Sequence, residues 1–492
     1  MEFRNNIINV ALLGTSKKQL SSADLTEDFT TIFEHINSTT SDTEEKYLQL
    51  AGVAFNYHQC GTINRTTDQS PLKIAPIEEK SLCSHNSISS LKEVLNAENY
   101  SLLGLWLDHC QKAHQIVSHE IIPQLFSIAE TQKNLREAIK NCCGKRGEWL
   151  SQFNPDWSFY KEITSEDDTW QTGTPEQRKL FLKNKRETDP EGGRAILQQS
   201  WNQESANTKT ELLRFLSINI SFEDEAWLKS LLNEKSQKVK DVVWELLKLI
   251  PESFIVNEYK SLLELNLILK KEKAIAGLIS KIVIEIKPIS SINELIYKSG
   301  IDKLSSSKEI SDDEYFVYQL MAYTPPSYLE TLFKLSPEEI VEALTKDSIG
   351  KKLLPAVISA TGRFKDKGWA LLLSHHTDKF YHELAFLLPA DEQEKYLLRN
   401  IDQHPQEVIT FSSNRNEEWS VALATGILKF TFSQYYQYNR SFYAKIIGLL
   451  PCSLLSQVNV LDTQVQSENM KEYILHLLAI KENILSSFKK LH

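Results

Sequence analysis

The stretch from residue 174 to residue 251 strongly restricts the fold, because it consists of short amphipathic helices joined by short loops. Thr174-Pro175-Glu176-Gln177 places a hydroxyl N-cap before a proline at the first helical position. The last helix of the stretch must end at Pro251, which cannot donate the next backbone hydrogen bond. Its apolar residues recur at intervals of three and four, at Val239, Val242, Val243, Leu246, Leu247 and Ile250. Such helices bury their apolar faces only by stacking on neighbouring helices.

These patterns predict an all-α protein, an irregular α-solenoid of stacked helical pairs similar to HEAT and armadillo repeats. The small numbers of glycines (16) and prolines (15) among 492 residues disfavour a fold of strands and tight turns. Within the solenoid, residues 270–281 are expected to form a lysine-rich helix. The expected regions are an N-terminal helical region (1–141) with a long polar loop at about 61–90, central HEAT-like repeats (142–300) and C-terminal helical repeats (313–492).

Charge and cysteine usage indicate the compartment and the partners. The 65 acidic and 55 basic residues give a formal net charge of −10, which repels nucleic-acid phosphates in bulk. The six cysteines lack the paired spacing of a zinc site or of a secreted disulfide scaffold, so they are expected to be reduced thiols. The sequence shows neither a signal peptide nor an apolar run long enough to span a membrane. We therefore expect a cytoplasmic protein.

Two groups of residues could bind a metal, although neither has the spacing of a known ligand set. We expect surface or helix-end histidines rather than ligands in the first group, and no cofactor in either. The first group is His375, His376 and His382, and the second is Cys60, Cys83 and His85.

The turn Gly144-Lys145-Arg146-Gly147 is the strongest candidate for a binding site, because it combines flexible backbone with two cations and is followed by Trp149 and Trp157. Such a turn could hold a phosphate or an acidic segment of a partner. Alternatively, a helix ends at Gly144, Lys145 and Arg146 bind its last carbonyls, and the tryptophans pack the joint. The second interpretation is favoured.

Several motifs in a fixed order are similar to a bacterial, mostly helical family of unassigned function. Its members resemble HEAT-repeat proteins and tend to be encoded near a MoxR-type AAA+ ATPase and a von Willebrand A-domain protein. The family implies no catalytic residue, and this chain has Gly193 where the family usually has alanine. The motifs are Ala11-Leu12-Leu13-Gly14-Thr15, Gly144-Lys145-Arg146-Gly147-x-Trp149-Leu150, Asn154-Pro155-x-Trp157, Trp170-x-x-Gly173-Thr174-Pro175-x-Gln177-Arg178, Arg186 with Asp189-Pro190, and Trp201-x-x-Glu204.

The function expected from these observations is that of a non-catalytic interaction scaffold or adaptor. The resemblance implies the AAA+ ATPase or the von Willebrand A-domain protein as the partner. No catalytic signature is present in the sequence, so an enzyme, for example a hydrolase, is a weaker hypothesis. The candidate binding residues are Lys145, Arg146, Trp149, Trp157 and Arg178.

The competing hypothesis is a nucleic-acid-binding or base-processing helical-repeat protein. The net charge of −10 argues against it, because such proteins are usually basic. Its support is a set of lysines on expected helices, namely Lys235, Lys238, Lys240, Lys270, Lys271 and Lys273.

Overall fold

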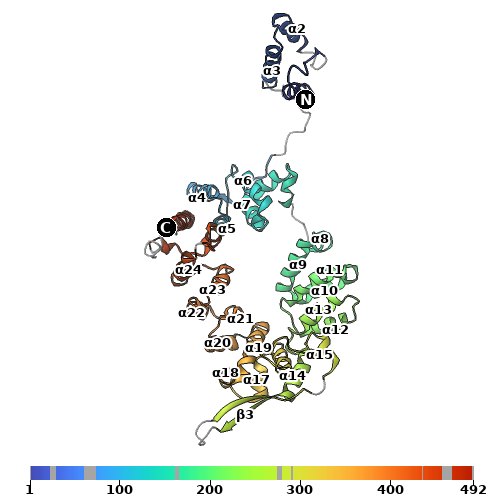
Figure 1. Ribbon diagram of the computed structural model, residues 1–492, viewed down its shortest axis with the longest axis vertical. Helices are drawn as coiled ribbons and strands as arrows, with labels where there is room; N and C mark the ends of the chain where they lie inside the picture. Colours follow the sequence, from blue (N-terminus) through green and yellow to red (C-terminus); the bar gives the residue numbers. More distant parts are fainter. Residues whose placement is uncertain are drawn as a thin grey trace. The chain divides into compact units, whose positions relative to one another are not determined.

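The structure is a computed structural model that describes residues 2–22, 29–59, 74–160, 166–273, 280–289, 292–434, 436–456 and 468–489. It is mostly α-helical, as the sequence predicted (Figure 1). Contacts divide the chain into two units, Met1–Ile74 and Ala75–His492.

The first unit contains three helices, α1 (Glu2–Leu13), α2 (Thr30–Thr39) and α3 (Thr43–Gln59). Their small core includes Ile7 and Phe29. Helix α1 ends before Gly14, because Gly14 adopts a positive φ of 85° and its N–H donates to the carbonyl of Val10 at 2.9 Å.

The second unit has two hydrophobic cores. One, the terminal core, joins residues 91–160 to residues 380–484, and the other, the central core, lies within residues 170–384. The terminal core is closed by the last helix, α26 (Glu468–Ser487), which packs on α4 (His85–Asn96). There the Ser87 hydroxyl donates to the carbonyl of Ser487 at 3.1 Å. The start and the end of the second unit therefore pack against each other.

The terminal core is built from helices at both ends of the second unit. The expected boundary at 141/142 lies inside one of them, α7. Besides α4 and α26, the helices and short strands of these two parts of the chain are β1 (Ser81–Leu82), α5 (Tyr100–Lys112), β2 (Gln115–Ile116), α6 (Ile122–Thr131), η3 (Lys133–Leu135), α7 (Arg136–Ser151), η4 (Pro155–Tyr160), α22 (Ala390–Asn400), α23 (Pro405–Ser413), α24 (Val421–Ser433), α25 (Arg440–Ile446), η8 (Ile447–Leu449) and η9 (Cys452–Ser456).

The central core takes one apolar face from each of its helices, and it continues without a break across residues 300–313 because Ile301 and Phe316 both belong to it. Its helical elements are α8 (Glu166–Thr172), α9 (Pro175–Thr188), α10 (Pro190–Ser200), η5 (Trp201–Gln203), α11 (Ala206–Leu213), η6 (Arg214–Ser217), η7 (Phe222–Asp224), α12 (Glu225–Leu231), α13 (Gln237–Leu247), α14 (Phe254–Asn266), α15 (Glu294–Lys298), α16 (Asp312–Ala322), α17 (Ser327–Phe333), α18 (Pro337–Lys346), α19 (Ser348–Phe364), α20 (Lys367–His376) and α21 (His382–Ala385).

The lysine-rich helix expected at 270–281 is wrong. Strand β3 (Leu267–Lys273) pairs antiparallel with β4 (Ser280–Ile286), in a register that runs from Leu267 opposite Ile286 to Lys273 opposite Ser280. β-branched residues in β4 favour extended backbone. Burial of Leu267 and Ile284 in the central core then fixes the hairpin against the helices.

The long loop expected at about 61–90 is also wrong at its end, because α4 already begins at His85. Ser84 caps this helix by accepting a hydrogen bond from the N–H of Ser87 at 3.1 Å. Two serines of this stretch, Ser87 and Ser90, are buried. The Ser90 hydroxyl donates to the carbonyl of Ser87, and this carbonyl also accepts from the Trp106 indole.

A buried ion pair joins the first helices of the central core. Arg186 and Asp224 are both 0% exposed, and Nη2 of Arg186 lies 2.9 Å from Oδ2 of Asp224. The guanidinium also donates to the carbonyls of Pro190, Leu216, Ile218 and Asn219. A β-carbon at Gly193 would lie 2.8 Å from Cδ of Arg186, so the glycine that departs from the family pattern makes room for this side chain within a formed helix.

A second buried cation, Lys248, lies at the end of α13 and is 5% exposed. Its ammonium group donates to the carbonyl of Ser299 at 3.0 Å. It lies 4.2 Å from the centroid of the Tyr323 ring, and the guanidinium of Arg363 lies at the same distance from that ring. Burial, together with the nearby positive charge of Arg363, lowers the pKa of Lys248 to about 8.

We expect Asp224→Asn to destabilise the second unit by about 3–5 kcal/mol, because it leaves the charge of Arg186 buried without a counter-ion. Urea unfolding followed by circular dichroism measures the loss. The matched control is Glu211→Gln, which removes the exposed ion pair between Lys179 of α9 and Glu211 of α11, 2.8 Å apart. An equal effect of both variants would contradict a special role of the buried pair.

The folded pKa of Lys248 lies below its ordinary value of 10.5, so the unfolded chain binds this proton first. The free energy of unfolding should therefore fall by about 3 kcal/mol as the pH drops from about 10.5 to about 8. Below about pH 8, Lys248 should cause no further change in this free energy. Lys248→Met should remove this part of the pH dependence. Lys238→Met, at an exposed position of the same helix, should retain it. Parallel pH profiles for both variants would contradict the assignment.

Candidate functional site at the Gly144 turn

Gly144 interrupts α7 with φ 61° and ψ −161°, a conformation almost restricted to glycine. The helix therefore has two halves, residues 136–143 and 145–151. The Tyr160 hydroxyl donates to the carbonyls of Lys140 and Gly144 at 3.0 and 2.9 Å, and the N–H of Val117 donates to the carbonyl of Cys142. These groups, rather than the side chains of Lys145 and Arg146, satisfy the carbonyls at the break, which corrects that detail of the capping interpretation.

The Gly144 turn holds an acidic segment of its own chain. The backbone N–H groups of Lys145 and Arg146 donate to the two carboxylate oxygens of Glu78, at 3.1 and 2.6 Å. A β-carbon at Gly144 would lie 2.6 Å from one of these oxygens. Glycine is thus required both for the backbone conformation and for the approach of the carboxylate.

The neighbouring Glu79 is bound by a side chain instead. Its Oε1 lies 2.5 Å from Nζ of Lys145. The hydrogen bond from Lys145 lowers the pKa of Glu79, and the same bond raises the pKa of Lys145. The Arg146 side chain is exposed. The turn thus binds two consecutive carboxylates, one through backbone donors and one through a cation.

The second glycine of the motif has a packing role. A β-carbon at Gly147 would lie 2.5 Å from Cβ of Cys143 and 2.8 Å from the Tyr160 hydroxyl. Burial raises the pKa of both Cys143 and Tyr160, so both remain protonated at neutral pH. An open cavity of about 240 Å³ lies beside the turn and is lined by Glu78, Glu79, Lys140, Lys145, Glu148 and Tyr160, among others.

The two tryptophans make different contacts, and Trp157 packs on another helix, α6. The Trp149 ring contacts Phe153 edge-on, with ring centroids 4.9 Å apart. The indole N–H of Trp157 donates to the carboxylate of Glu130 at 3.0 Å, and its ring packs on Phe126.

Arg178, the fifth candidate, is engaged elsewhere. Its guanidinium lies 4.4 Å from the centroid of the Trp170 ring and pairs with the carboxylate of Glu204. The structure thus brings Lys145, Arg146 and Trp149 to the second half of α7 and Trp157 to the following η4, and it places Arg178 in a separate contact between α9 and the segment after η5.

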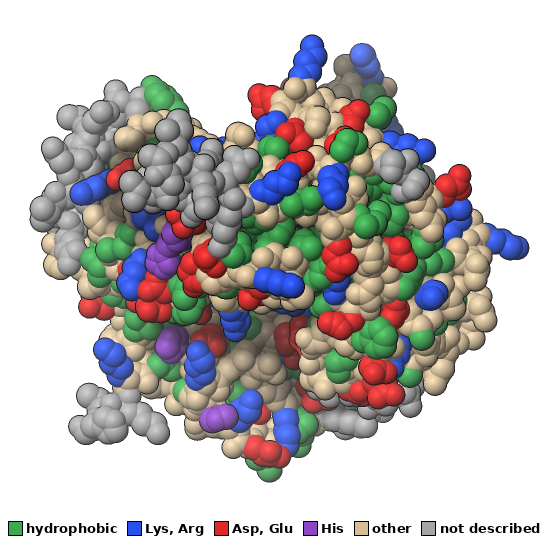
Figure 2. Space-filling model, turned by 90° about the horizontal axis from the view of Figure 1, so that it is seen from below, with side chains coloured by type: hydrophobic (Ala, Val, Ile, Leu, Met, Phe, Trp, Pro, Cys, Tyr) green, Lys and Arg blue, Asp and Glu red, His purple; other side chains and the backbone are tan. Residues whose placement is uncertain are grey.

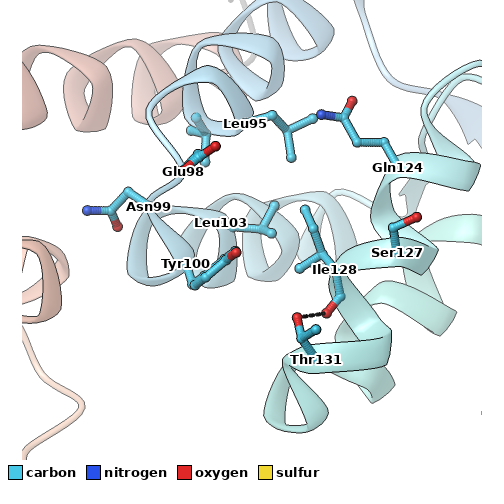
Figure 3. A pocket seen from close by; sticks show the side chains of 10 residues that line it. Leu95, Glu98, Asn99, Tyr100, Leu103, Gln124, Ser127, Ile128 and Thr131 are labelled. Atoms are coloured by element: carbon cyan, nitrogen blue, oxygen red, sulfur yellow. Dashed lines mark hydrogen bonds between the residues drawn. The ribbon is translucent and has the colours of Figure 1, made fainter. Parts of the chain in front are cut away.

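A further cavity, of about 270 Å³, was not expected from the sequence (Figure 3). It lies between the α4–α5 corner and α6, and the residues that line it are mostly uncharged. Glu98 at the corner has a positive φ of 49°, and Asn99 caps α5 by accepting from the N–H of Leu102 at 2.9 Å. The labelled lining residues are Leu95, Glu98, Asn99, Tyr100, Leu103, Gln124, Ser127, Ile128 and Thr131.

Within the described residues, no group of three or more His, Cys, Asp and Glu side chains could hold a metal ion. Cys60 lies outside the described residues. His375 lies 3.6 Å from Glu392, whereas His382 packs against the rings of Phe380 and Phe411. In the same part of the chain, no helix has both the length and the apolar character needed to cross a membrane.

The comparison with protein families matches residues 6–484 to a family of unknown function, DUF5691. The chain belongs to the DUF5691 family. No curated protein and no solved structure shows significant similarity to it. The expected membership of a mostly helical family of unassigned function is thus confirmed, and it covers nearly the whole chain.

In this DUF5691 protein the motifs between 170 and 224 act in packing. Thr174 and Gln177 form a capping box at the start of α9, and Asp189 caps α10 by accepting from the N–H of Gly192 at 2.9 Å. Arg178 pairs with Glu204. The polar motif residues therefore cap the starts of α9 and α10, and Arg178 connects α9 to the segment after η5.

We expect Gly144→Ala to strain the turn by about 1–3 kcal/mol and to displace the Glu78 carboxylate. Hydrogen exchange should then show loss of protection at the amides of Lys145 and Arg146. Gly104→Ala is the matched control, because its added β-carbon would meet only Leu135, at an ordinary 3.5 Å. Retained protection of both amides in Gly144→Ala would show that the carboxylate does not depend on the glycine.

Proposed function

We propose that this protein is a non-catalytic interaction scaffold or adaptor, built as an irregular solenoid of stacked helical pairs similar to HEAT repeats. Helices adjacent in sequence pack as pairs, for example α9 with α10, α12 with α13 and α18 with α19. Each contributes buried residues to the central core. Stacked pairs of this kind provide extended surfaces that bind elongated partners.

The observation that carries the proposal is that charged side chains form ion pairs between different helices. Arg186 connects α9 to η7 through Asp224 and to η6 through the carbonyl of Leu216, and Arg194 of α10 reaches the Asp224 carboxylate at 3.0 Å. These groups set the spacing of the helices rather than reacting with a substrate. A fixed helix spacing is what a binding surface assembled from several helices requires.

A protein partner is better supported than a nucleic acid. On the face seen in Figure 2, acidic and basic side chains are interspersed over the described residues. The lysines 270, 271 and 273 lie in strand β3 rather than on a helix face, and Lys270 pairs with Glu285 across the hairpin. The family resemblance favours a MoxR-type AAA+ ATPase and a von Willebrand A-domain protein as partners.

The test is affinity capture with the full chain, followed by lysine cross-linking and mass spectrometry. We expect the ATPase or the von Willebrand A-domain protein to be retained, with cross-links to the helices between 166 and 385. Asp224→Asn is the matched variant, because loosening these helices should reduce capture several-fold, whereas Glu211→Gln should leave it unchanged.

Two outcomes would contradict the proposal. Capture that returned neither protein would exclude these partners. A mobility shift of nucleic acid at low salt that disappeared at high salt would favour the competing function, because release of counterions drives such binding.

A further inference from the structure

Two thiols lie in contact at the end of residues 75–83, the first residues of the second unit, which are called the joining segment below. Sγ of Cys83 is 3.5 Å from Sγ of Cys110. Cys83 is half-buried and directly follows β1, whereas Cys110 is fully buried in α5. One thiol can therefore be reached from solvent and the other only through its neighbour.

Strand β2 holds both cysteines in place. β1 pairs with it in parallel, with Ser81 opposite Gln115 and Leu82 opposite Ile116. The N–H of Cys83 continues this pairing by donating to the carbonyl of Ile116 at 2.8 Å, and the Cys110 thiol donates to the carbonyl of Gln115 at 3.2 Å. The two sulfur atoms are thus positioned by neighbouring residues of one strand.

We propose that Cys83 and Cys110 form a reversible disulfide when the protein meets a peroxide, and that this bond fastens residues 75–83 to α5 of the same unit. The sulfur atoms must approach from 3.5 Å to about 2.05 Å. The two atoms are already in contact, so this approach is short.

The reaction balances with hydrogen peroxide as the oxidant. The Cys83 thiolate attacks one peroxide oxygen, the O–O bond breaks, and the leaving hydroxide takes up the thiol proton as water, which leaves a sulfenic acid. The Cys110 sulfur then attacks the Cys83 sulfur, the S–O bond breaks, and the departing hydroxide leaves as water with the Cys110 proton. Two thiols and one peroxide give one disulfide and two waters.

The order of the two steps follows from the surroundings of the thiols. The hydrogen bond between Cys83 and Cys110 lowers the pKa of Cys83, which favours its thiolate. Hydrogen bonds with Cys142 and Cys83, together with burial, raise the pKa of Cys110. Cys83 is thus the residue that meets the oxidant, and Cys110 resolves the sulfenic acid.

The bond would change how the joining segment is held. In the reduced protein, residues 75–83 are fixed by Glu78 and Glu79 at the Gly144 turn and by the two-residue pairing of β1. The ion pair between Glu79 and Lys145 is exposed, so salt weakens it. A disulfide would hold the same segment at any ionic strength.

The experiment uses the full chain, treated with hydrogen peroxide or with a reductant, alkylated and digested without reduction. Trypsin places Cys83 in peptide 81–92 and Cys110 in peptide 93–112, each with a single cysteine. We expect the oxidised protein, and also Cys142→Ser, to yield these two peptides joined, and reductant to separate them. Cys83→Ser should give no joined peptide while it retains the melting temperature of the parent.

A second measurement follows residues 75–84 by hydrogen exchange at high salt, where the oxidised parent should be protected several-fold more than the reduced one. The proposal would be overturned if, in the folded protein treated with peroxide, the thiols of Cys83 and Cys110 were both still free and became alkylated. A dominant Cys110–Cys142 link, or a Cys83 oxidised only to sulfinic acid, would overturn it as well.

Discussion

The central core depends on the buried charge of Arg186. A guanidinium that is 0% exposed must have its donors satisfied, and here they are satisfied by one carboxylate and four backbone carbonyls. These acceptors belong to α10, η6, η7 and the connection between them, so α9 is fixed against three other segments at once. The glycine at 193 is a consequence, because the arginine side chain occupies the space of its β-carbon.

The features that the sequence predicted correctly depend on neighbours in the chain. The N-cap at Thr174 is a local hydrogen bond, and the end of α13 before Pro251 reflects the missing N–H of proline, so both leave a readable pattern. The features that were missed depend on distant contacts. Ser87, for example, bonds to a carbonyl 400 residues away, and no local pattern distinguishes such a buried serine from one in a loop.

The candidate site likewise has one part that the sequence predicted and one part that depends on a distant contact. The sequence indicated a flexible turn with cations at 144–146, but it could not identify the occupant. Glu78 is 67 residues away from Lys145 and is recognised by backbone N–H groups, which are common to nearly all residues and therefore have no sequence signature. The hairpin at 267–286 was missed because its lysines suit an exposed helix as well as an exposed strand.

The joining segment and the helical cores differ in how strongly they are held. A single hydrogen bond contributes about 0.5–1.5 kcal/mol net, and the segment has only a few, beside an exposed ion pair. Detaching it therefore costs much less than separating helices that share a buried ion pair and a continuous apolar core. A change at the segment can alter its attachment while the helical surface keeps its geometry, because local opening needs only the free energy of the contacts that it breaks. Under the function proposed above, opening of residues 75–83 would therefore leave the packing of the helices unchanged.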